Sequence, residues 1–149
     1  MAILTTLKQG FIRQEIDLVP TYITVKLDFD TYNVGSTDTF NIADLPVAPG
    51  KYLVPLFFST NVTTADGETA TCDFGLKPTT GSTFTADPNG LDDTVNLNSA
   101  VVSQGVIGTD AQMGARIDLT TGATLYGTPA HALEDGVAYV TLGYILHSY

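Results

Sequence analysis

The chain has 149 residues, of which 44% are hydrophobic, and its formal net charge at pH 7 is −10. Only 15% of its residues are charged, against about 25% in an average soluble domain. The six basic residues are scattered and none are adjacent, so no basic stripe is available to neutralise phosphates. We therefore expect no nucleic-acid partner, and the acidic surface favours a positively charged protein partner.

Residues 1–20 show neither helical nor strand periodicity and end at Pro20. We interpret them as an extended N-terminal arm, followed by a single β-sandwich domain over 21–149; an ordinary first strand of that domain is the alternative for the arm. The segment lacks a charged start followed by a long apolar run, so it predicts no secretory signal. The run YLVPLFF is too short to span a bilayer, and we expect synthesis in the cytoplasm and no membrane partner.

Strand patterns recur after residue 20. In YITVKLDF (22–29) apolar residues occupy every second position, which predicts a half-buried strand. DTFNIADL (38–45) follows, and then KYLVPLFFST (51–60), where alternation places Leu56 and Phe58 on one face with Tyr52 and Val54. Because Pro55 cannot donate a ladder hydrogen bond, this strand is expected to lie at a sheet edge or to carry a bulge.

The second half of the chain continues the same pattern. Asp66-Gly67 indicates a hairpin turn into TATCDFGL (69–76), where the single cysteine, Cys72, shares a face with apolar residues and is expected to be a buried, inert thiol. Thr121-Gly122 indicates a tight reversal between GARIDLT and ATLYGT. The closing segment GVAYVTLGYILHSY carries apolar residues on both faces, which predicts a strand buried on both sides.

Helical turns are predicted only for 93–102 and 129–136, and both are short. Seven or eight strands with turn signals every 8 to 15 residues indicate an all-β fold, namely an antiparallel sandwich, a jelly roll or a related barrel.

The acidic stretch FTADPNGLDD (84–93) is the first candidate for a binding site. A calcium loop of the EF-hand type needs a glycine at its sixth position and a carboxylate at its twelfth, but with Asp87 as position one, Gly90 is already at position four. The stretch fits a type I turn with Pro88 at the second place. A cation held by Asp87, Asp92 and Asp93 stays open as an alternative.

Other candidates for catalysis or metal binding are weaker. The carboxylates pair as Asp28/Asp30, Asp66/Glu68, Asp92/Asp93 and Glu134/Asp135. Asp28 and Asp30 suit a glycosidase pair by spacing, but a solvated strand end is the favoured interpretation because the chain has no tryptophan to stack a sugar. His131 and Glu134 supply two of the three protein ligands of a catalytic zinc site, and His147 lies in another segment. We expect no enzymatic activity, no metal and no cofactor.

The order of segments indicates more than any single site. From Asp38 onward the chain runs DTFNIADLPVAPGKYLVPLFFSTNVTTADGETATCDFGLKP, then an acidic turn, and later LYGTPAHALEDGVAYVTLGY. This layout resembles the small tailed-phage virion proteins that decorate or cement the head. The residues that carry the resemblance are Leu45, Pro46, Asp73, Gly75, Asp87, Pro88, Gly127, Thr128, Pro129 and the segment 140–144.

The resemblance implies an antiparallel β-sandwich of jelly-roll type with about eight strands and an N-terminal arm. It also implies a protein without enzymatic activity that binds the major capsid protein in many copies on the outer surface of a phage capsid, after synthesis in the host cytoplasm. A homotrimer is the oligomer that it favours. In this view the arm contacts the capsid through apolar anchors, namely Ile3, Leu4, Leu7, Phe11, Ile12 and Ile16.

Two other functions suit the same sequence. One is a tail or connector subunit present in few copies. The other is a carbohydrate-binding or receptor-binding β-sandwich module, for which the seven tyrosines would supply stacking surfaces. A hydrolytic enzyme on the same fold has the least support.

Overall fold

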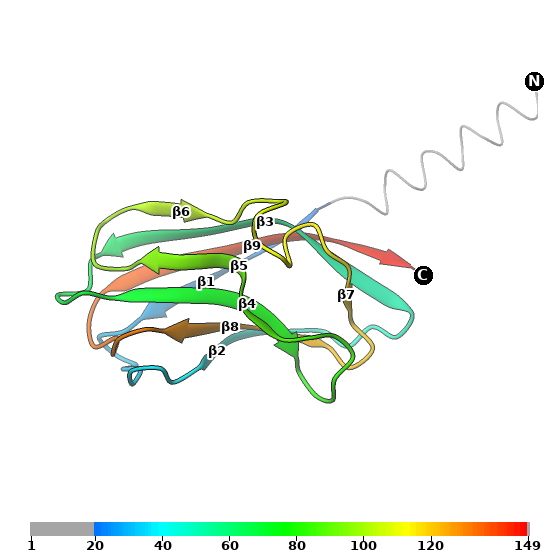
Figure 1. Cartoon of the computed structure of the whole chain (residues 1–149), viewed down its shortest axis with the longest axis horizontal. Coiled ribbons are helices and arrows are strands. Elements are labelled where there is room, and N and C mark those ends of the chain that lie inside the picture. The colour runs from blue at the N-terminus through cyan, green and yellow to red at the C-terminus, as the bar shows by residue number, and fades with distance from the viewer. Residues whose placement is uncertain (1–19, 149) are drawn as a thin grey trace, which may run out of the picture.

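The computed structural model describes residues 20–148, which form two antiparallel β-sheets packed face to face (Figure 1). The all-β prediction is confirmed, and the sandwich has nine strands where about eight were expected. The strands are β1 (Thr21–Asp28), β2 (Phe40–Leu45), β3 (Lys51–Thr64), β4 (Thr71–Pro78), β5 (Asp87–Asn96), β6 (Val102–Gln104), β7 (Ile117–Asp118), β8 (Ala123–Pro129) and β9 (Val137–Ser148).

The strand order is that of a jelly roll. One sheet has the order β1-β9-β3-β6, with the short β7 also paired to β3, and the other has the order β2-β8-β4-β5. Among consecutive strands only β4 and β5 are hydrogen-bonded to each other, and most connections cross from one sheet to the other. Two four-stranded sheets linked in this way define the jelly roll, with β7 as an addition between β6 and β8.

The crossing connections correct the predicted hairpin at Asp66-Gly67. β3 belongs to the first sheet and β4 to the second, so this turn carries the chain between sheets instead of pairing the two strands. The reversal at Thr121-Gly122 is present, with the Gly122 N–H donating to the Leu119 carbonyl at 3.0 Å, and it also connects the two sheets.

A bulge in β3 explains where its side chains point. The register against β9 shifts between Pro55 and Phe57, so Pro55 marks a bulge in a central strand and the edge-strand alternative is wrong. The bulge exchanges the two faces: Leu53 is fully buried before it and Phe58 after it, while Leu56 is exposed. The predicted face that joined Leu56 to Phe58 is therefore incorrect.

The predicted helical turns over 93–102 and 129–136 are wrong, because residues 20–148 contain no helix. In the first segment Val95 and Leu97 are buried on either side of exposed Asn96, which is strand periodicity. The second segment contains the end of β8 and an irregular connection, where Val34 and Leu133 form an isolated bridge.

The core lies between the sheets and is built from both of them. In β1 the predicted alternation is confirmed, since Leu27 is buried and Lys26 is exposed. In the closing strand β9 one face is buried, while Tyr139 on the other face is 37% exposed, so the expected burial on both sides is only partial. The largest fully buried side chains are Phe58, Phe74, Leu53, Leu76, Leu91, Leu97, Leu119, Leu125, Leu133, Leu142, Val95 and Val140.

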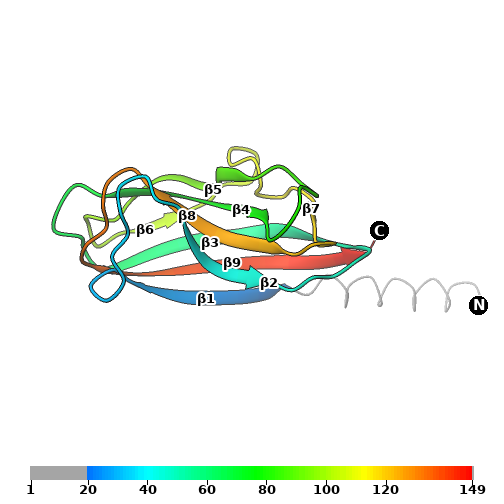
Figure 2. The same cartoon turned by 90° about the horizontal axis from the view of Figure 1, so that it is seen from below.

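The two sides of the sandwich differ. On one side the edge strands β1 and β2 of the two sheets run side by side (Figure 2). On the opposite side β6 ends the first sheet and β5 ends the second. Along residues 20–148 we find no helix of the length and apolar character needed to cross a membrane.

Candidate interaction surfaces

An exposed apolar edge follows β6. Among the described residues, four of the nine exposed large apolar side chains fall between positions 101 and 107. We call Val101, Val102, Val106 and Ile107 the apolar edge; their exposed fractions run from 41% to 63%. Within residues 20–148, β6 pairs with β3 on one side only, so its other side has no strand partner in this part of the chain.

Local hydrogen bonds hold the apolar edge in place. The Gly105 N–H donates to the Phe58 carbonyl at 3.0 Å, which attaches the end of β6 to the core strand β3. The Val106 N–H donates to Asp110 Oδ2 at 2.6 Å, and the Asp110 N–H returns a bond to the Val106 carbonyl at 2.9 Å. The loop after β6 is thus closed on itself, and it presents Val106 and Ile107 in a fixed arrangement.

A groove of about 400 Å³ lies between β1 and β2. Its floor is apolar, with Val25, Phe40 and Ile42 partly buried against the core. Its rim is polar and aromatic. The Tyr32 side chain is 75% exposed, and Lys26 Nζ forms an ion pair with Asp28 Oδ2 at 3.8 Å. This volume is within the range of sites that bind small molecules.

The acidic stretch 84–93 is not the predicted turn, because β5 already begins at Asp87. Pro88 cannot donate to a ladder, and it falls where six residues of β5, from Asp87 to Asp92, lie opposite only three residues of β4, from Phe74 to Leu76. The extra length is absorbed as an irregularity within the strand instead of a separate turn.

The aspartates of this stretch are directed to different partners. Asp87 Oδ1 accepts the Asn89 N–H at 3.3 Å, while Asp92 is buried and its Oδ2 accepts the Ser103 hydroxyl at 2.8 Å. Asp93 Oδ1 accepts the Thr94 hydroxyl at 2.9 Å. Among the described residues, no three His, Cys, Asp or Glu side chains gather to hold a metal ion, so Asp87, Asp92 and Asp93 do not come together around a cation.

Two of the nearby carboxyls have shifted acidity. Burial raises the pKa of Asp92 above its ordinary value, the Ser103 hydrogen bond opposes this shift, and the charge of Asp110 adds to it. Burial likewise raises the pKa of Asp73. The hydrogen bond from the Thr94 N–H lowers this pKa in part, and the neighbouring Asp93 raises it further. These shifts have structural causes and do not define a catalytic pair.

The remaining sequence candidates lie apart from one another. β1 ends at Asp28, whose Oδ1 accepts the Thr31 N–H at 3.2 Å, so the solvated strand end expected for Asp28 and Asp30 is observed. His131 and Glu134 are exposed in an irregular connection, so they do not share a helix face. His147 stacks on Tyr52 with ring centroids 5.1 Å apart. Cys72 is buried as expected.

The predicted capsid-contact residues Ile3, Leu4, Leu7, Phe11, Ile12 and Ile16 lie outside the described residues. The apolar edge and the groove, in contrast, were missed by sequence reasoning. The signal for the apolar edge was the run VVSQGVI (101–107), whose four apolar residues were partly absorbed into a predicted helix. The groove had no local signal, because the crossing connection between β1 and β2 creates it.

The fold is thus a jelly roll of the kind that occurs in viral capsids and lectins. Neither a protein-family model nor a curated protein sequence matches this chain. Among solved structures the chain is similar to a protein in the capsid of Ralstonia phage GP4, with a TM-score of 0.58 and 16% identity over 85% of this chain and 84% of that one.

Two further solved structures are similar at lower scores. The cyanophage Pam1 capsid asymmetric unit has a TM-score of 0.49 and 12% identity, over 86% of this chain and 84% of that one. The acidic stable capsid of Helicobacter pylori bacteriophage KHP30 has a TM-score of 0.48 and 12% identity, over 88% of this chain and 94% of that one. Of these three only the first exceeds 0.5, so the likeness rests on the Ralstonia phage structure and concerns the fold.

Proposed function

We propose that this protein is a structural virion protein that decorates and stabilises a phage capsid by binding the major capsid protein in many copies. The observation that carries the proposal is the apolar edge on a jelly roll whose fold occurs in a phage capsid. The resemblance of the segment order to head decoration proteins supports the same function, without enzymatic activity, on the outer surface of the particle.

The apolar edge has the properties of a contact surface. A soluble protein normally protects an edge strand with charges, and exposed apolar clusters mark binding sites or aggregation risks. Here Val102 is 63% exposed and Ile107 is 57% exposed next to the free side of β6. Burying one such side chain contributes about 1.5–3 kcal/mol, so a capsid protein that covered the edge would gain several kcal/mol per copy.

The net charge of −10 suits this function. It keeps free copies apart before assembly and favours a partner whose surface is basic. We propose that the protein assembles as a homotrimer and that residues 1–20 act as an arm that adds further apolar contacts. Several weak contacts acting together on one lattice raise the total affinity above that of any single contact.

Sedimentation with undecorated capsid shells tests the proposal. Wild-type protein should sediment with shells at a fixed stoichiometry, and Val102→Asp and Ile107→Asp should each reduce the bound fraction at least tenfold. Val47→Asp is the matched control, since Val47 is 61% exposed in the connection after β2, outside the apolar edge. Equal binding by all four proteins would exclude the apolar edge as the contact surface.

The arm is tested separately by deleting residues 1–16. The remaining chain contains all nine strands, so we expect a folded protein that no longer binds shells. A truncated protein that decorates shells as well as the full chain would show that residues 1–16 are not the contact arm.

The groove between β1 and β2 favours carbohydrate binding as a second candidate function. An exposed tyrosine at the rim can stack on a sugar ring, and the Lys26–Asp28 pair supplies polar groups beside it. Binding to a glycan array that is lost in Tyr32→Ala, together with no binding to shells, would favour this function over the capsid function.

A further inference from the structure

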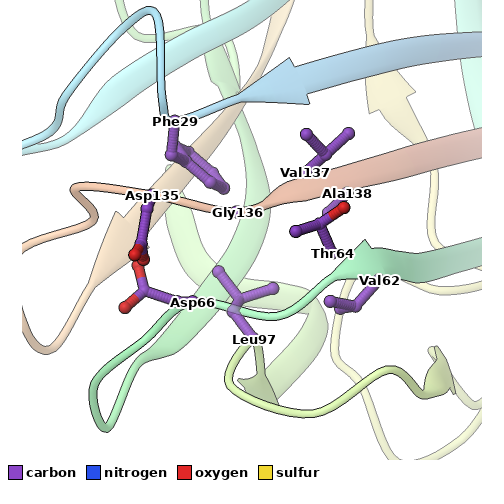
Figure 3. Close-up of a pocket in the computed structure, with 9 residues that line it drawn as sticks. All are labelled: Phe29, Val62, Thr64, Asp66, Leu97, Asp135, Gly136, Val137 and Ala138. Carbon is purple, nitrogen blue, oxygen red and sulfur yellow. The ribbon is translucent and has the colours of Figure 1, made fainter.

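Two carboxylates from different connections meet at one end of the sandwich. Asp66 lies between β3 and β4, and Asp135 lies between β8 and β9. Figure 3 shows their carboxylates pointing toward one another. The sequence contains these residues in two separate acidic pairs, 66/68 and 134/135, and the fold brings one member of each pair together.

Backbone donors fix one oxygen of each carboxylate. The Gly67 N–H donates to Asp135 Oδ1 at 2.7 Å, and the next N–H along the chain, that of Glu68, donates to Asp66 Oδ1 at 3.0 Å. Because adjacent backbone groups hold both carboxylates, the two side chains keep a defined position relative to each other.

Asp66 has an unsatisfied oxygen. The residue is only 6% exposed, and its Oδ2 is buried without a hydrogen-bond partner. Within residues 20–148 no lysine or arginine forms an ion pair with Asp66 or Asp135. A buried carboxylate that has one oxygen without a hydrogen bond and no counter-charge nearby is unfavourable, and here the group that faces it is a second carboxylate.

The backbone around the pair is closely packed. Gly136 has a φ of +94°, and a Cβ at this position would lie 2.8 Å from the Thr64 carbonyl oxygen and 2.9 Å from the Asp66 nitrogen. The Asp66 N–H also donates to the Leu97 carbonyl at 2.9 Å. The β8–β9 connection is therefore packed closely against the β3–β4 connection, and a side chain at position 136 would push the two connections apart.

The interior side of the pair is dry. The pocket next to it is lined mainly by apolar groups, including Phe29, Val62 and Leu97, and it has no room for a water molecule (Figure 3). Asp135 is exposed, so solvent reaches the pair from its side. A ligand that satisfies Asp66 Oδ2 would enter from that side.

We propose that Asp66 and Asp135 bind a hard divalent cation, Ca²⁺ or Mg²⁺, with water completing the coordination shell. Both ions prefer oxygen ligands such as carboxylates, and the weakest calcium sites of proteins, the class expected for two carboxylates, have dissociation constants of about 10⁻⁴–10⁻³ M. The cation supplies the positive charge that the pair lacks and ties the β3–β4 connection to the β8–β9 connection. This site is independent of the capsid contact proposed above.

Denaturant unfolding of the full chain at pH 8 tests the site. We compare 10 mM CaCl₂, 10 mM MgCl₂ and NaCl at equal ionic strength. With a dissociation constant of 0.1–1 mM, 10 mM Ca²⁺ should raise the folding equilibrium constant about 10- to 100-fold. The stronger of the two cation responses identifies the preferred ion.

Asp66→Asn and Asp135→Asn should each remove this response, whatever their stability in NaCl. Asp135 is exposed, so its variant keeps the test available if Asp66→Asn does not fold. Glu134→Gln is the matched control, because it removes the same charge one position away and should keep the full response. A response to neither cation, or an equal response in all four proteins, overturns the proposal.

Discussion

Phe58 of β3 and Phe74 of β4 pack against each other across the two sheets, with ring centroids 5.4 Å apart and no exposed surface on either side chain. The contact joins the two sheets at the centre of the core, so the stability of the sandwich depends on it.

Phe58→Ala and Phe74→Ala should each lower the free energy of unfolding by about 3–5 kcal/mol, because each leaves a cavity in a closely packed interior. Phe57→Ala is the control, since Phe57 is only partly buried and makes an edge contact with Tyr22 on the outer face; its cost should be clearly smaller. Equal losses in denaturant unfolding for positions 57 and 58 would contradict the register of β3.

The bulge at Pro55 makes a second prediction about the same strand. Leu53→Ala should cost about 2–5 kcal/mol of unfolding free energy, because Leu53 is fully buried, whereas Leu56→Ala should cost far less, because Leu56 is 39% exposed. Simple alternation along 51–60 predicts the opposite for Leu56. A large loss at Leu56 with a small loss at Leu53 would mean that the bulge is absent.

The strands could be predicted where one face is polar throughout. β1 follows the period-two pattern because Tyr22, Thr24 and Lys26 all face outward. β3 could be located but not its faces, because the bulge moves Phe58 to the inner side without any change in residue type. The end of β5 has a bulge at Asp93 and Thr94, where Thr94 has a φ of +52°. The two polar residues interrupt the apolar–polar alternation of the strand, so the sequence there predicts a helical turn instead.

The single cysteine provides a third prediction. Cys72 is 1% exposed, and burial raises the pKa of its thiol well above the usual range, with a further contribution from the charge of Asp73. Because the thiolate is the reactive species, native protein at pH 8 should not react with a disulfide reagent such as 5,5′-dithiobis(2-nitrobenzoic acid). Full reaction should follow in denaturant, and rapid reaction of the native protein would contradict the buried position.

Asp92 provides a prediction about pH. Its pKa is higher in the folded protein than in the unfolded chain because the carboxyl is buried. The folded state therefore binds its proton more tightly, and the stability that protonation contributes is lost as pH rises through the raised pKa. As the pH rises from about 4, the ordinary pKa of aspartate, to about 7, the unfolding free energy of Asp92→Asn should therefore increase relative to that of the wild type.

Ser103→Ala provides the control for Asp92. The hydroxyl of Ser103 donates to Asp92 Oδ2 and lowers the pKa of the carboxyl. Removing this donor should move the pH-dependent change in stability to higher pH than in the wild type. A constant difference between Asp92→Asn and wild type across this pH range would show that Asp92 does not titrate as its burial requires.

The candidate sites depend on contacts that are distant in sequence. Asp66 and Asp135 are 69 positions apart, and only the crossing connections place Gly67 beside Asp135. The groove similarly joins β1 to β2 from two different sheets. Local patterns indicated an all-β fold and a buried Cys72, but they carry no information about which loops share an end of the sandwich.

The capsid function is tested most directly by the copy number of this protein in purified virus particles. Quantitative mass spectrometry against the major capsid protein gives this ratio. Decoration of the whole lattice predicts a ratio near one or another simple fraction set by the lattice symmetry. A handful of copies per particle would assign the protein to the tail or connector, and its absence from particles would contradict the virion function altogether.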